Sequence, residues 1–177
     1  MSKTIRLIAV LALCLPGILL AQDKKKSAEQ VWNDLYSKRE GKEHKFNKFL
    51  AEAVKGRTPG KALDIGMGQG RNSLFLAALG WEVTGFDISD VAVKQAKESA
   101  EKRGLKINAT VGDVDKFDYG KERYDLIVGM YMHEYLNRNA KKVMAALKPG
   151  GIVVVEGIQR DINKQNLTGD KYGYFPN

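Results

Sequence analysis

The stretch KALDIGMGQGRN, residues 61–72, constrains the fold of this chain more than any other feature. A short apolar run stops at Asp64, and Gly66, Gly68 and Gly70 then occupy alternate positions before a helical pattern begins. A strand that ends in a glycine turn and leads into a helix lets a ligand approach the backbone closely and leaves N–H groups free to bind it. The sequence therefore predicts a nucleotide-like ligand at the carboxyl end of this strand.

Short β-rich runs alternate with longer helical runs through the rest of the chain. Strands are expected over residues 61–66, 81–87, 106–113, 123–130 and 151–157, and helices over 71–80, 89–104 and 138–150. We expect Ser89 or Asp90 to cap the second of these helices and Pro149-Gly150-Gly151 to end the third. Alternation at these lengths specifies right-handed crossovers and a parallel sheet covered on both faces. The predicted fold class is α/β, a doubly wound and mostly parallel sheet.

The first 21 residues differ from the rest of the chain. Lys3 and Arg6 precede an uninterrupted apolar stretch that turns abruptly polar after Ala21, which is the pattern of a secretory signal peptide. We expect either export with cleavage after Ala21 or an uncleaved membrane anchor that leaves the protein facing the cytoplasm. We expect the protein to associate with a membrane only through this N-terminal segment.

Residues 22–177 are expected to form one domain, with two helices within 27–56 and a ligand-binding core over 60–157. The sequence beyond Gly157 is polar and contains no pair of strand patterns. The C-terminal edge strands of such a sheet are therefore expected to be missing, and the chain is expected to be a fragment of a longer protein. A sheet that ended here would expose one edge to pairing or aggregation.

The residue types present exclude several kinds of chemistry. Cys14 is the only cysteine and lies in the predicted leader, so we expect no disulfide, no catalytic thiolate and no cysteine zinc site. The only histidines are His44 and His133, and a metal site built by the protein is not expected. The formal net charge is +8, but Lys and Arg are mixed with Glu along the chain, which argues against a nucleic-acid partner.

Two classes of nucleotide cofactor compete for the glycine turn. The dinucleotide fingerprint G-x-G-x-x-G, counted from Gly66 and Gly68, requires a third glycine where the chain has Arg71. An acid two residues before the turn suits a ligand with a cationic or amino group and suits a pyrophosphate poorly. Asp64 therefore favours S-adenosylmethionine, and an NAD(P)-dependent oxidoreductase is the less favoured alternative.

Several motifs in order resemble those of the class I S-adenosylmethionine-dependent methyltransferases, over about residues 45–157. The motifs are ALDIGMGQGRNSLFLA, VTGFD, VGDV, YDLIVGMYMHEYL and LKPGG followed by IVVVEG. The resemblance implies that Asp87 takes both ribose hydroxyls, which suits a carboxylate that accepts two charge-assisted hydrogen bonds. It also implies that Asp113 accepts from the adenine amino group and that Val114 touches the ring. The full implied cofactor set is Asp64, Gly66, Gly68, Gly70, Asp87, Ile88, Asp113, Val114 and Met130.

Structural interpretations remain open for some of these acids. Asp64 and the glycines would also serve a tight turn, Asp87 would also cap the next helix, and Asp113 is also consistent with a turn residue. Asp125 begins its strand, so we interpret it as structural, because sites in such sheets lie at the opposite edge.

The loop after the fourth strand, GMYMHEYL, is expected to face the transferred methyl group. It offers Tyr131 to orient the acceptor and His133 as a general base, although His133 is equally consistent with a solvated neighbour of Glu134 at the start of a helix. The [DNS]-P-P-[YFW] motif of methyltransferases that act on base amines or glutamine is absent here.

A small-molecule acceptor is therefore favoured. The stretch GQGRNSLFLAALGWEVTGFDIS, together with W..LY in the N-terminal helices and the entry PGKALDIG, is similar to the branch that contains the tellurite-resistance and thiopurine-type methyltransferases. The alternative to an enzyme is an exported relative that binds a nucleoside or a partner without turnover. The oligomeric state is not predicted.

Overall fold

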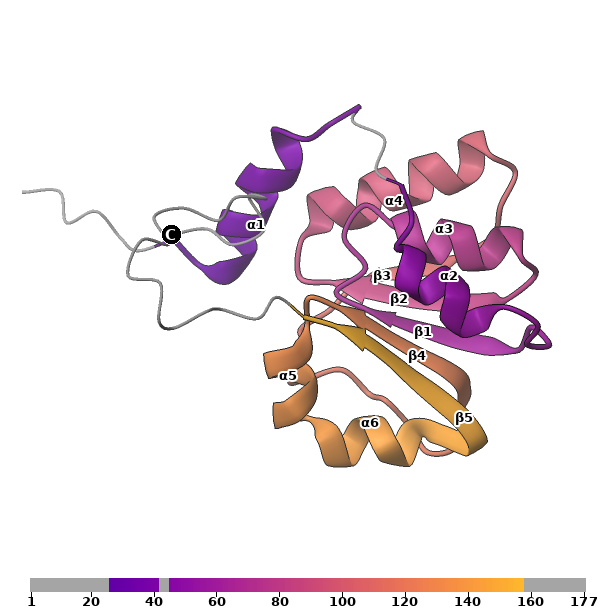
Figure 1. Ribbon diagram of the computed structural model, residues 1–177. Coiled ribbons are helices and arrows are strands. Elements are labelled where there is room, and N and C mark those ends of the chain that lie inside the picture. The colour runs from indigo at the N-terminus through magenta and orange to yellow at the C-terminus, as the bar shows by residue number, and fades with distance from the viewer. Residues whose placement is uncertain (1–25, 42–44, 158–177) are drawn as a thin grey trace, which may run out of the picture.

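The computed structural model describes residues 26–41 and 45–157 (Figure 1). The export signal predicted for residues 1–21 and the expectation about the segment after Gly157 concern parts of the chain outside these ranges, so both stay predictions. Within the described ranges, no helix is both long enough and apolar enough to cross a lipid bilayer.

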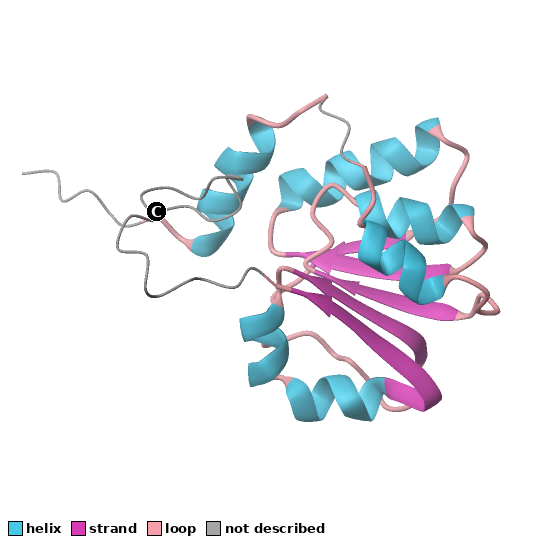
Figure 2. Ribbon diagram, viewed as in Figure 1, coloured by secondary structure: helices cyan, strands magenta, loops and turns pink. Residues whose placement is uncertain are grey.

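The core is a single sheet of parallel strands (Figure 2). In chain order the strands are β1 (Lys61–Ile65), β2 (Glu82–Asp87), β3 (Asn108–Val111), β4 (Tyr124–Met130) and β5 (Leu147–Glu156). They lie in the order β3-β2-β1-β4-β5, and every neighbouring pair is parallel. The direction of winding reverses between β1 and β4, and ligands of such sheets bind outside the carboxyl ends at that point. The doubly wound α/β fold predicted from the sequence is confirmed.

Helices cover both faces of the sheet, with α2, α3 and α4 on one face and α5 and α6 on the other (Figure 1). Their bounds are α1 (Ala28–Ser37), α2 (Lys48–Val54), α3 (Arg71–Ala78), α4 (Asp90–Lys102), α5 (His133–Arg138) and α6 (Ala140–Ala146). Ser27, Asn47 and Ser89 cap α1, α2 and α4 by accepting backbone N–H groups. Ser89 is thus the cap that the sequence left open between two residues.

Strand side chains alternate between two hydrophobic clusters, one on each face of the sheet. Leu126 and Val128 of β4 pack with Leu50 of α2 and Leu76 of α3. Ile127, which lies between them, packs in the second cluster. The other members of that second cluster include Leu63, Ile65, Phe86, Leu136, Val143 and Ala146. Burying each such side chain stabilises the fold by about 1.5–3 kcal/mol, which holds the strand ends in fixed register.

The predicted helix over residues 138–150 is too long at both ends. The structure divides this segment into the end of α5, the short helix α6 and the start of β5, which begins at Leu147, before Pro149. Leu147 pairs with Tyr124, and the register then shifts before Leu126 pairs with Ile152. Tertiary pairing with β4 therefore overrides the helical pattern, and a proline is tolerated because β5 has one strand neighbour among the described residues.

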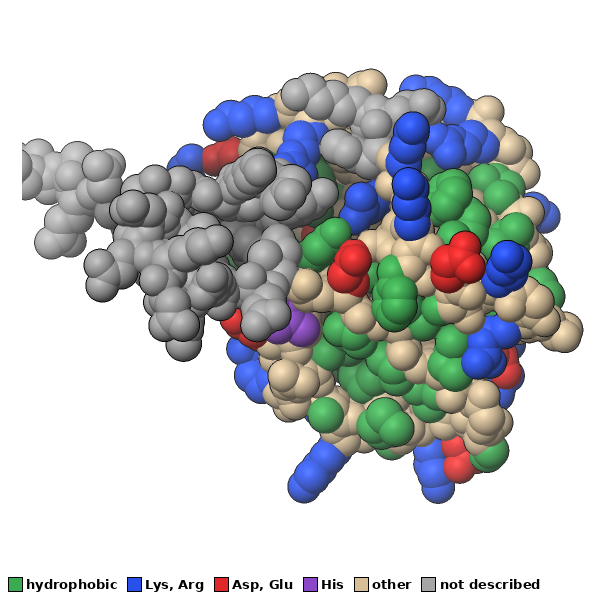
Figure 3. Space-filling view, in the orientation of Figure 1, with side chains coloured by type: hydrophobic (Ala, Val, Ile, Leu, Met, Phe, Trp, Pro, Cys, Tyr) green, Lys and Arg blue, Asp and Glu red, His purple; other side chains and the backbone are tan. Residues whose placement is uncertain are grey.

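The basic side chains are spread over the surface. On the face drawn in Figure 3, Lys and Arg lie at several places, both along the outline and within it, and do not gather into one continuous patch. Several are paired with acids, as in Lys61–Glu82 at 3.7 Å and Lys148–Asp125 at 2.8 Å. The net charge is therefore distributed on this face as the sequence predicts.

Candidate active site

A pocket of about 360 Å³ lies at the carboxyl ends of the strands, where the winding of the sheet reverses. The turn after β1, the end of β2, the loop after β3, the segment after β4 and helix α1 all contribute to its walls. Most of the residues predicted as a site line it together, namely Gly66, Gly68, Asp87, Ile88, Asp113, Val114, Met130 and Tyr131. The predicted site residues Asp64, Gly70 and His133 do not line it.

The glycine turn after β1 leaves no room for side chains. Gly66 and Gly68 have φ angles of +66° and +54°, which favour glycine. A Cβ atom on Gly66 would lie 2.7 Å from the sulfur of Met132, and one on Gly68 would lie 2.7 Å from the hydroxyl of Tyr36. The backbone of this turn is therefore exposed to a ligand in the pocket, with other residues of the site directly above it.

Gly70 serves a contact between helices. A Cβ atom on Gly70 would lie 2.9 Å from the Cβ of Ala96, so the start of α3 packs directly against α4. Gly70 does not line the pocket, so its predicted contact with a ligand stays a prediction. The third glycine positions the helix, and the first two form the pocket wall.

Asp64 lies beneath the glycine turn, with only 2% of its surface exposed. Its Oδ2 accepts a hydrogen bond of 2.7 Å from the hydroxyl of Ser73 in α3. Burial raises the pKa of Asp64 to about 6, although the hydrogen bond from Ser73 acts in the opposite direction. The carboxyl group therefore supports the glycine turn without lining the pocket. Its contacts in this structure are those expected if Asp64 serves only a tight turn.

Asp87, at the end of β2, is 6% exposed and still lines the pocket. Its two carboxylate oxygens accept backbone N–H groups, one from Gly68 at 2.8 Å and one from Ser89 at 2.9 Å. Burial raises the pKa of Asp87, while these two hydrogen bonds act to lower it. Because Ser89 provides the cap of α4, Asp87 is fixed in place as a buried acceptor at the pocket wall.

The loop after β3 brings Asp113 and Val114 to the pocket. Asp113 accepts the backbone N–H of Asp115 at 2.9 Å, so its side chain forms the turn that the sequence left as an alternative. The carbonyl of Val114 accepts the hydroxyl of Tyr119 at 2.9 Å. Burial raises the pKa of Tyr119 to about 12, so this hydroxyl remains a donor at neutral pH. These two hydrogen bonds fix the loop, and the predicted contacts of Asp113 and Val114 with a ligand stay predictions.

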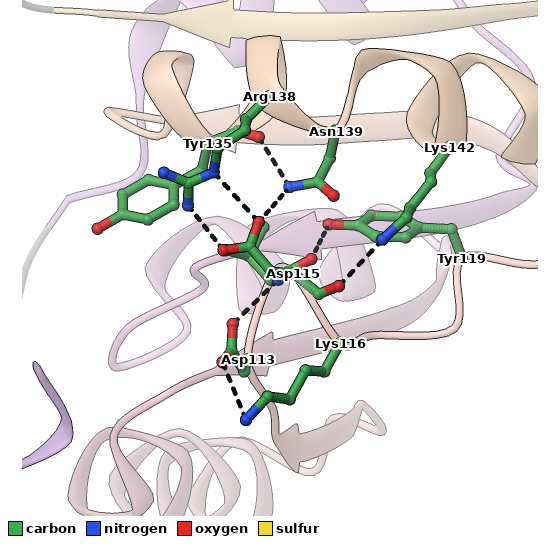
Figure 4. Close-up of polar contacts among 9 residues, drawn as sticks. Asp113, Asp115, Lys116, Tyr119, Tyr135, Arg138, Asn139 and Lys142 are labelled. Atoms are coloured by element: carbon green, nitrogen blue, oxygen red, sulfur yellow. Dashed lines mark hydrogen bonds and ion pairs between the residues drawn. The ribbon is translucent and has the colours of Figure 1, made fainter.

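Asp115 joins this loop to the helices after β4 (Figure 4). Its carboxylate accepts from Nε and Nη2 of Arg138 at 3.2 and 2.8 Å and from the amide of Asn139 at 2.7 Å. Lys142 donates to its backbone carbonyl at 2.9 Å, and the Arg138 guanidinium lies 4.8 Å from the ring centroid of Tyr135. The hydrogen bonds from Asn139 and Arg138 lower the pKa of Asp115. Sequence reasoning missed this cluster, because no motif spans its separate segments.

The segment after β4 presents Tyr131 to the pocket in an unusual backbone conformation. Tyr131 has a φ angle of +64°, a left-handed conformation that costs about 1–3 kcal/mol in a residue other than glycine. Its N–H donates to the carbonyl of Glu156 at 2.6 Å, and its ring centroid lies 5.9 Å from the guanidinium carbon of Arg71. Such a conformation at a pocket wall is typical of functional positions.

His133 is the first residue of α5, as the alternative interpretation of this segment proposed. Its Nδ1 lies 2.8 Å from the point that a Cβ atom on Gly157 would occupy, and it has no hydrogen-bond partner among the described residues. The imidazole is therefore directed toward the end of β5 and away from the pocket lining. Its role as a general base stays a prediction.

Helix α1 supplies a wall that the sequence analysis did not assign to the site. Trp32 and Tyr36 stack at 5.9 Å and line the pocket. Gln95 donates to the carbonyl of Tyr36 at 3.4 Å, and Gln69 donates to the carbonyl of Arg39 at 3.3 Å and to the side chain of Gln95 at 2.8 Å. No residue of α1 is buried. The two aromatic residues four positions apart were the one available signal of this wall.

Comparison with known families identifies the fold and its pocket. The sequence model of a family described as a methyltransferase domain matches residues 62–151, just over half of the chain. The chain belongs to this methyltransferase-domain family. The matched region runs from β1 into the start of β5 and includes the glycine turn, Asp87 and the loop after β3.

Curated relatives of this methyltransferase domain have assigned activities. The chain is 38% identical over 89 residues to the probable S-adenosyl-L-methionine-dependent methyltransferase TehB of Haemophilus influenzae, a match that covers 50% of this chain and 31% of the relative. It is 35% identical over 102 residues to the ubiquinone biosynthesis O-methyltransferase of Coxiella burnetii, covering 56% of this chain and 44% of the relative. The chain thus spans between about a third and a half of the length of these curated relatives.

Solved structures share the same fold. The crystal structure of TehB from Haemophilus influenzae superposes with a TM-score of 0.58 at 29% identity, over 70% of this chain and 44% of that one. A solved structure from work on the conversion of a disulfide bond into a thioacetal group during echinomycin biosynthesis superposes with a TM-score of 0.60 at 27% identity. The match covers 73% of this chain and 58% of that one. The resemblance expected from the motifs is confirmed at the level of family and fold.

Proposed function

We propose that this chain binds S-adenosylmethionine and catalyses methyl transfer to a small-molecule acceptor. The observation that carries the proposal is Asp87, a buried carboxylate at the end of β2 that is fixed by the N–H groups of Gly68 and Ser89 and still reaches the pocket. A vicinal diol is the ligand group best suited to a carboxylate in that position, because each oxygen has a further lone pair to accept one hydroxyl.

The rest of the pocket fits the other parts of this cofactor. The backbone of Gly66 and Gly68 permits close approach at the centre, and Asp113 and Val114 offer polar and apolar groups at the side of β3. The aromatic and thioether side chains of the pocket suit this ligand, because its adenosine presents a polarisable surface and its sulfonium a cationic one. Family membership and the named activities of the relatives support the same assignment.

The bound cofactor would supply an electrophilic methyl group. The protein would hold the acceptor in line with that methyl group and exclude water. Positioning alone contributes much of the acceleration of such a displacement. Tyr131 is placed to orient an acceptor, since it lines the pocket directly after β4. Trp32 and Tyr36 of α1 cover the pocket and would exclude water.

A small-molecule acceptor is favoured over a macromolecule. The pocket of about 360 Å³ lies within the range of small-ligand sites. The GMYM sequence after β4 departs from the motif of enzymes that methylate base amines or glutamine, and the charge on the drawn face forms no continuous basic patch (Figure 3). The relatives' names support small acceptors of more than one chemical type.

Calorimetric titration of S-adenosylhomocysteine into the whole chain tests the proposal. We expect micromolar binding, and a loss of at least about tenfold in the Asp87→Asn variant, which keeps the size of the side chain but removes its charge. Asp90→Asn is the matched control, because Asp90 is an exposed acid three residues further on that does not line the pocket. An equal loss in both variants would contradict the assigned role of Asp87.

The same titration separates the alternatives. Binding of NADH in place of S-adenosylhomocysteine would favour an oxidoreductase, and binding of the nucleoside without methyl transfer to any acceptor would favour a relative without turnover. We further propose that the segment over residues 1–21 directs export or anchors the domain to a membrane, which fractionation of cells that produce the full chain will test.

A further inference from the structure

A second pocket, of about 300 Å³, opens at the amino ends of β1, β2 and β4, the edge of the sheet opposite the candidate active site. The residues that line it are Lys61, Glu82, Thr84, Glu122, Arg123, Tyr124 and Lys148. Its volume lies at the lower end of the range of small-ligand sites. Ligands of such sheets bind at the carboxyl ends of the strands, so the fold does not by itself explain a pocket at this edge.

Two hydroxyl groups belong to the less exposed residues of the second pocket. Tyr124, the first residue of β4, is 3% exposed, and its hydroxyl has no hydrogen-bond partner among the described residues. A buried hydroxyl without a partner lowers stability, and a ligand that accepts from it would remove that penalty. Burial raises the pKa of Tyr124, so the hydroxyl stays protonated and able to donate at neutral pH. Thr84 of β2 is half-buried and offers a second hydroxyl.

Two of the three cations that line the second pocket are only loosely paired. The ammonium of Lys61 lies 3.7 Å from Glu82, and the guanidinium of Arg123 lies 3.8 Å from Asp118. The side chains of these two acids are 74% and 90% exposed, and exposed ion pairs contribute little. The third cation, Lys148, has a closer acid partner at 2.8 Å. The donors of Lys61 and Arg123 are therefore available to a ligand.

Backbone contacts hold the segment that carries Arg123. The N–H groups of Glu122 and Arg123 donate to the carbonyls of Ala145 and Ala146, each at 2.8 Å, at the end of α6. Glu122 has a φ angle of +49°, a left-handed conformation that is uncommon outside glycine and concentrates at ligand sites. The guanidinium carbon of Arg123 lies 5.6 Å from the ring centroid of Tyr124. The guanidinium and the tyrosine are therefore positioned together before any ligand binds.

We propose that the second pocket binds a phosphate group. Phosphate oxygens accept hydrogen bonds from hydroxyl, ammonium and guanidinium donors, and Arg and Lys are suited to bind phosphates. The two acids that line the pocket, Glu82 and Glu122, are exposed, so water and salt screen their repulsion of an anion. A pocket of about 300 Å³ also leaves room for a small organic group beside the phosphate, so the ligand is a small phosphate monoester or free phosphate.

Thermal unfolding of the whole chain tests the proposal and separates the two sources of phosphate. We expect about 10 mM glycerol 3-phosphate to raise the melting temperature by about 3–6 °C relative to sodium chloride of the same ionic strength, which corresponds to a dissociation constant of about 1 mM. Inorganic phosphate at the same concentration is the second ligand. A shift with either ligand supports a phosphate site, and the larger shift identifies the form that the pocket prefers.

Three variants locate the site. Arg123→Met should weaken the affinity about tenfold, which lowers the shift to about a third. Lys121→Met is the matched control, because Lys121 is an exposed cation two residues away that does not line the second pocket, and it should keep the full shift. Tyr124→Phe should not lower the melting temperature of the ligand-free chain, because its hydroxyl has no partner, yet it should lower the shift to about two thirds.

Three results would overturn the proposal. One is a melting temperature that phosphates raise no further than sodium chloride does, and another is an equal shift in Arg123→Met and the unmodified chain. The third is an equal loss in Lys121→Met and Arg123→Met, which would indicate a general effect of charge. Because the second pocket lies at the opposite edge of the sheet from the cofactor site, each of these results leaves the proposed function unaffected.

Discussion

Replacing Asp64 with asparagine should remove a pH-dependent decrease in the free energy of unfolding. The carboxyl group is 2% exposed, and burial raises its pKa from an ordinary value of 3.8 to about 6. Each unit of pKa difference between the folded and unfolded chain corresponds to about 1.4 kcal/mol. The ionised carboxylate therefore destabilises the folded chain at neutral pH by about 3 kcal/mol relative to its protonated form.

The sign follows from proton binding. Between about pH 4 and pH 6 the folded chain keeps a proton on Asp64 that the unfolded chain has released, so the contribution of Asp64 to stability falls as pH rises through this window. Above about pH 6 both states are ionised and the contribution no longer changes. Asparagine does not titrate, and its Oδ1 can still accept the hydroxyl of Ser73.

The measurement is the free energy of unfolding in urea at pH 4 and at pH 7. The amide of asparagine places a donor where the carboxylate was an acceptor, which costs about 1–2 kcal/mol at either pH. We therefore expect Asp64→Asn to be slightly less stable than the unmodified chain at pH 4 and about 1–2 kcal/mol more stable at pH 7. The difference between the two pH values, about 2–2.5 kcal/mol, is the quantity derived from the structure, because Asp64 of the unfolded chain is already more than half ionised at pH 4.

Asp125 provides a control of opposite sign. Its hydrogen bond from Lys148 lowers its pKa, so its contribution is present at neutral pH and is lost as pH falls through that lowered value. Asp125→Asn should lose less than about 1 kcal/mol at both pH values, because the pair lies near the surface and its lowered pKa lies below pH 4. If the effect of Asp64→Asn changes by less than about 1 kcal/mol between the two pH values, the carboxyl group is solvated or paired, and the reasoning fails.

Two further predictions concern the walls of the pocket. Gln95→Ala removes the donor to the carbonyl of Tyr36, and because α1 buries no residue, we expect S-adenosylhomocysteine to dissociate about three- to tenfold faster in stopped-flow tryptophan fluorescence, with an unchanged melting temperature. An unchanged dissociation rate would contradict the role given to this contact. Asp115→Asn should weaken binding of the same ligand about threefold or more by loosening the loop after β3, whereas Asp118→Asn, paired at 3.8 Å with Arg123, should leave it unchanged.

The parts of the site that the sequence could predict are those in which one local pattern determines the structure. Three alternating glycines after an apolar run are compatible with few turns, and the alternation of strands with helices leaves a parallel sheet as the favoured arrangement. Asp87 and Asp113 could be placed for the same reason, since each ends a strand or directly follows one. It was less predictable which of these residues would face the ligand, because Asp64 and Gly70 lie next to the pocket wall in sequence but pack behind it.

The parts that could not be predicted depend on contacts between distant segments. The bond between Asp115 and Arg138 joins residues 23 positions apart, and no spacing rule connects them. The start of β5 at Leu147 follows from its pairing with Tyr124, which a local helical pattern cannot reveal. The same holds for α1. It is hydrogen-bonded to the amide side chains of Gln69 in the glycine turn and Gln95 in α4, which give no hydrophobic signal.

The order of the pocket residues along the chain has a consequence for how such a protein can change. Among the described residues, every one that lines the pocket lies between Ala28 and Tyr135, before β5 begins. The cofactor half of the site is thus encoded in one contiguous portion of the sequence, and loops at its edge are free to vary while the strands keep it aligned. If the proposed function is right, recombination or insertion after that portion would leave the residues that hold the methyl donor unchanged.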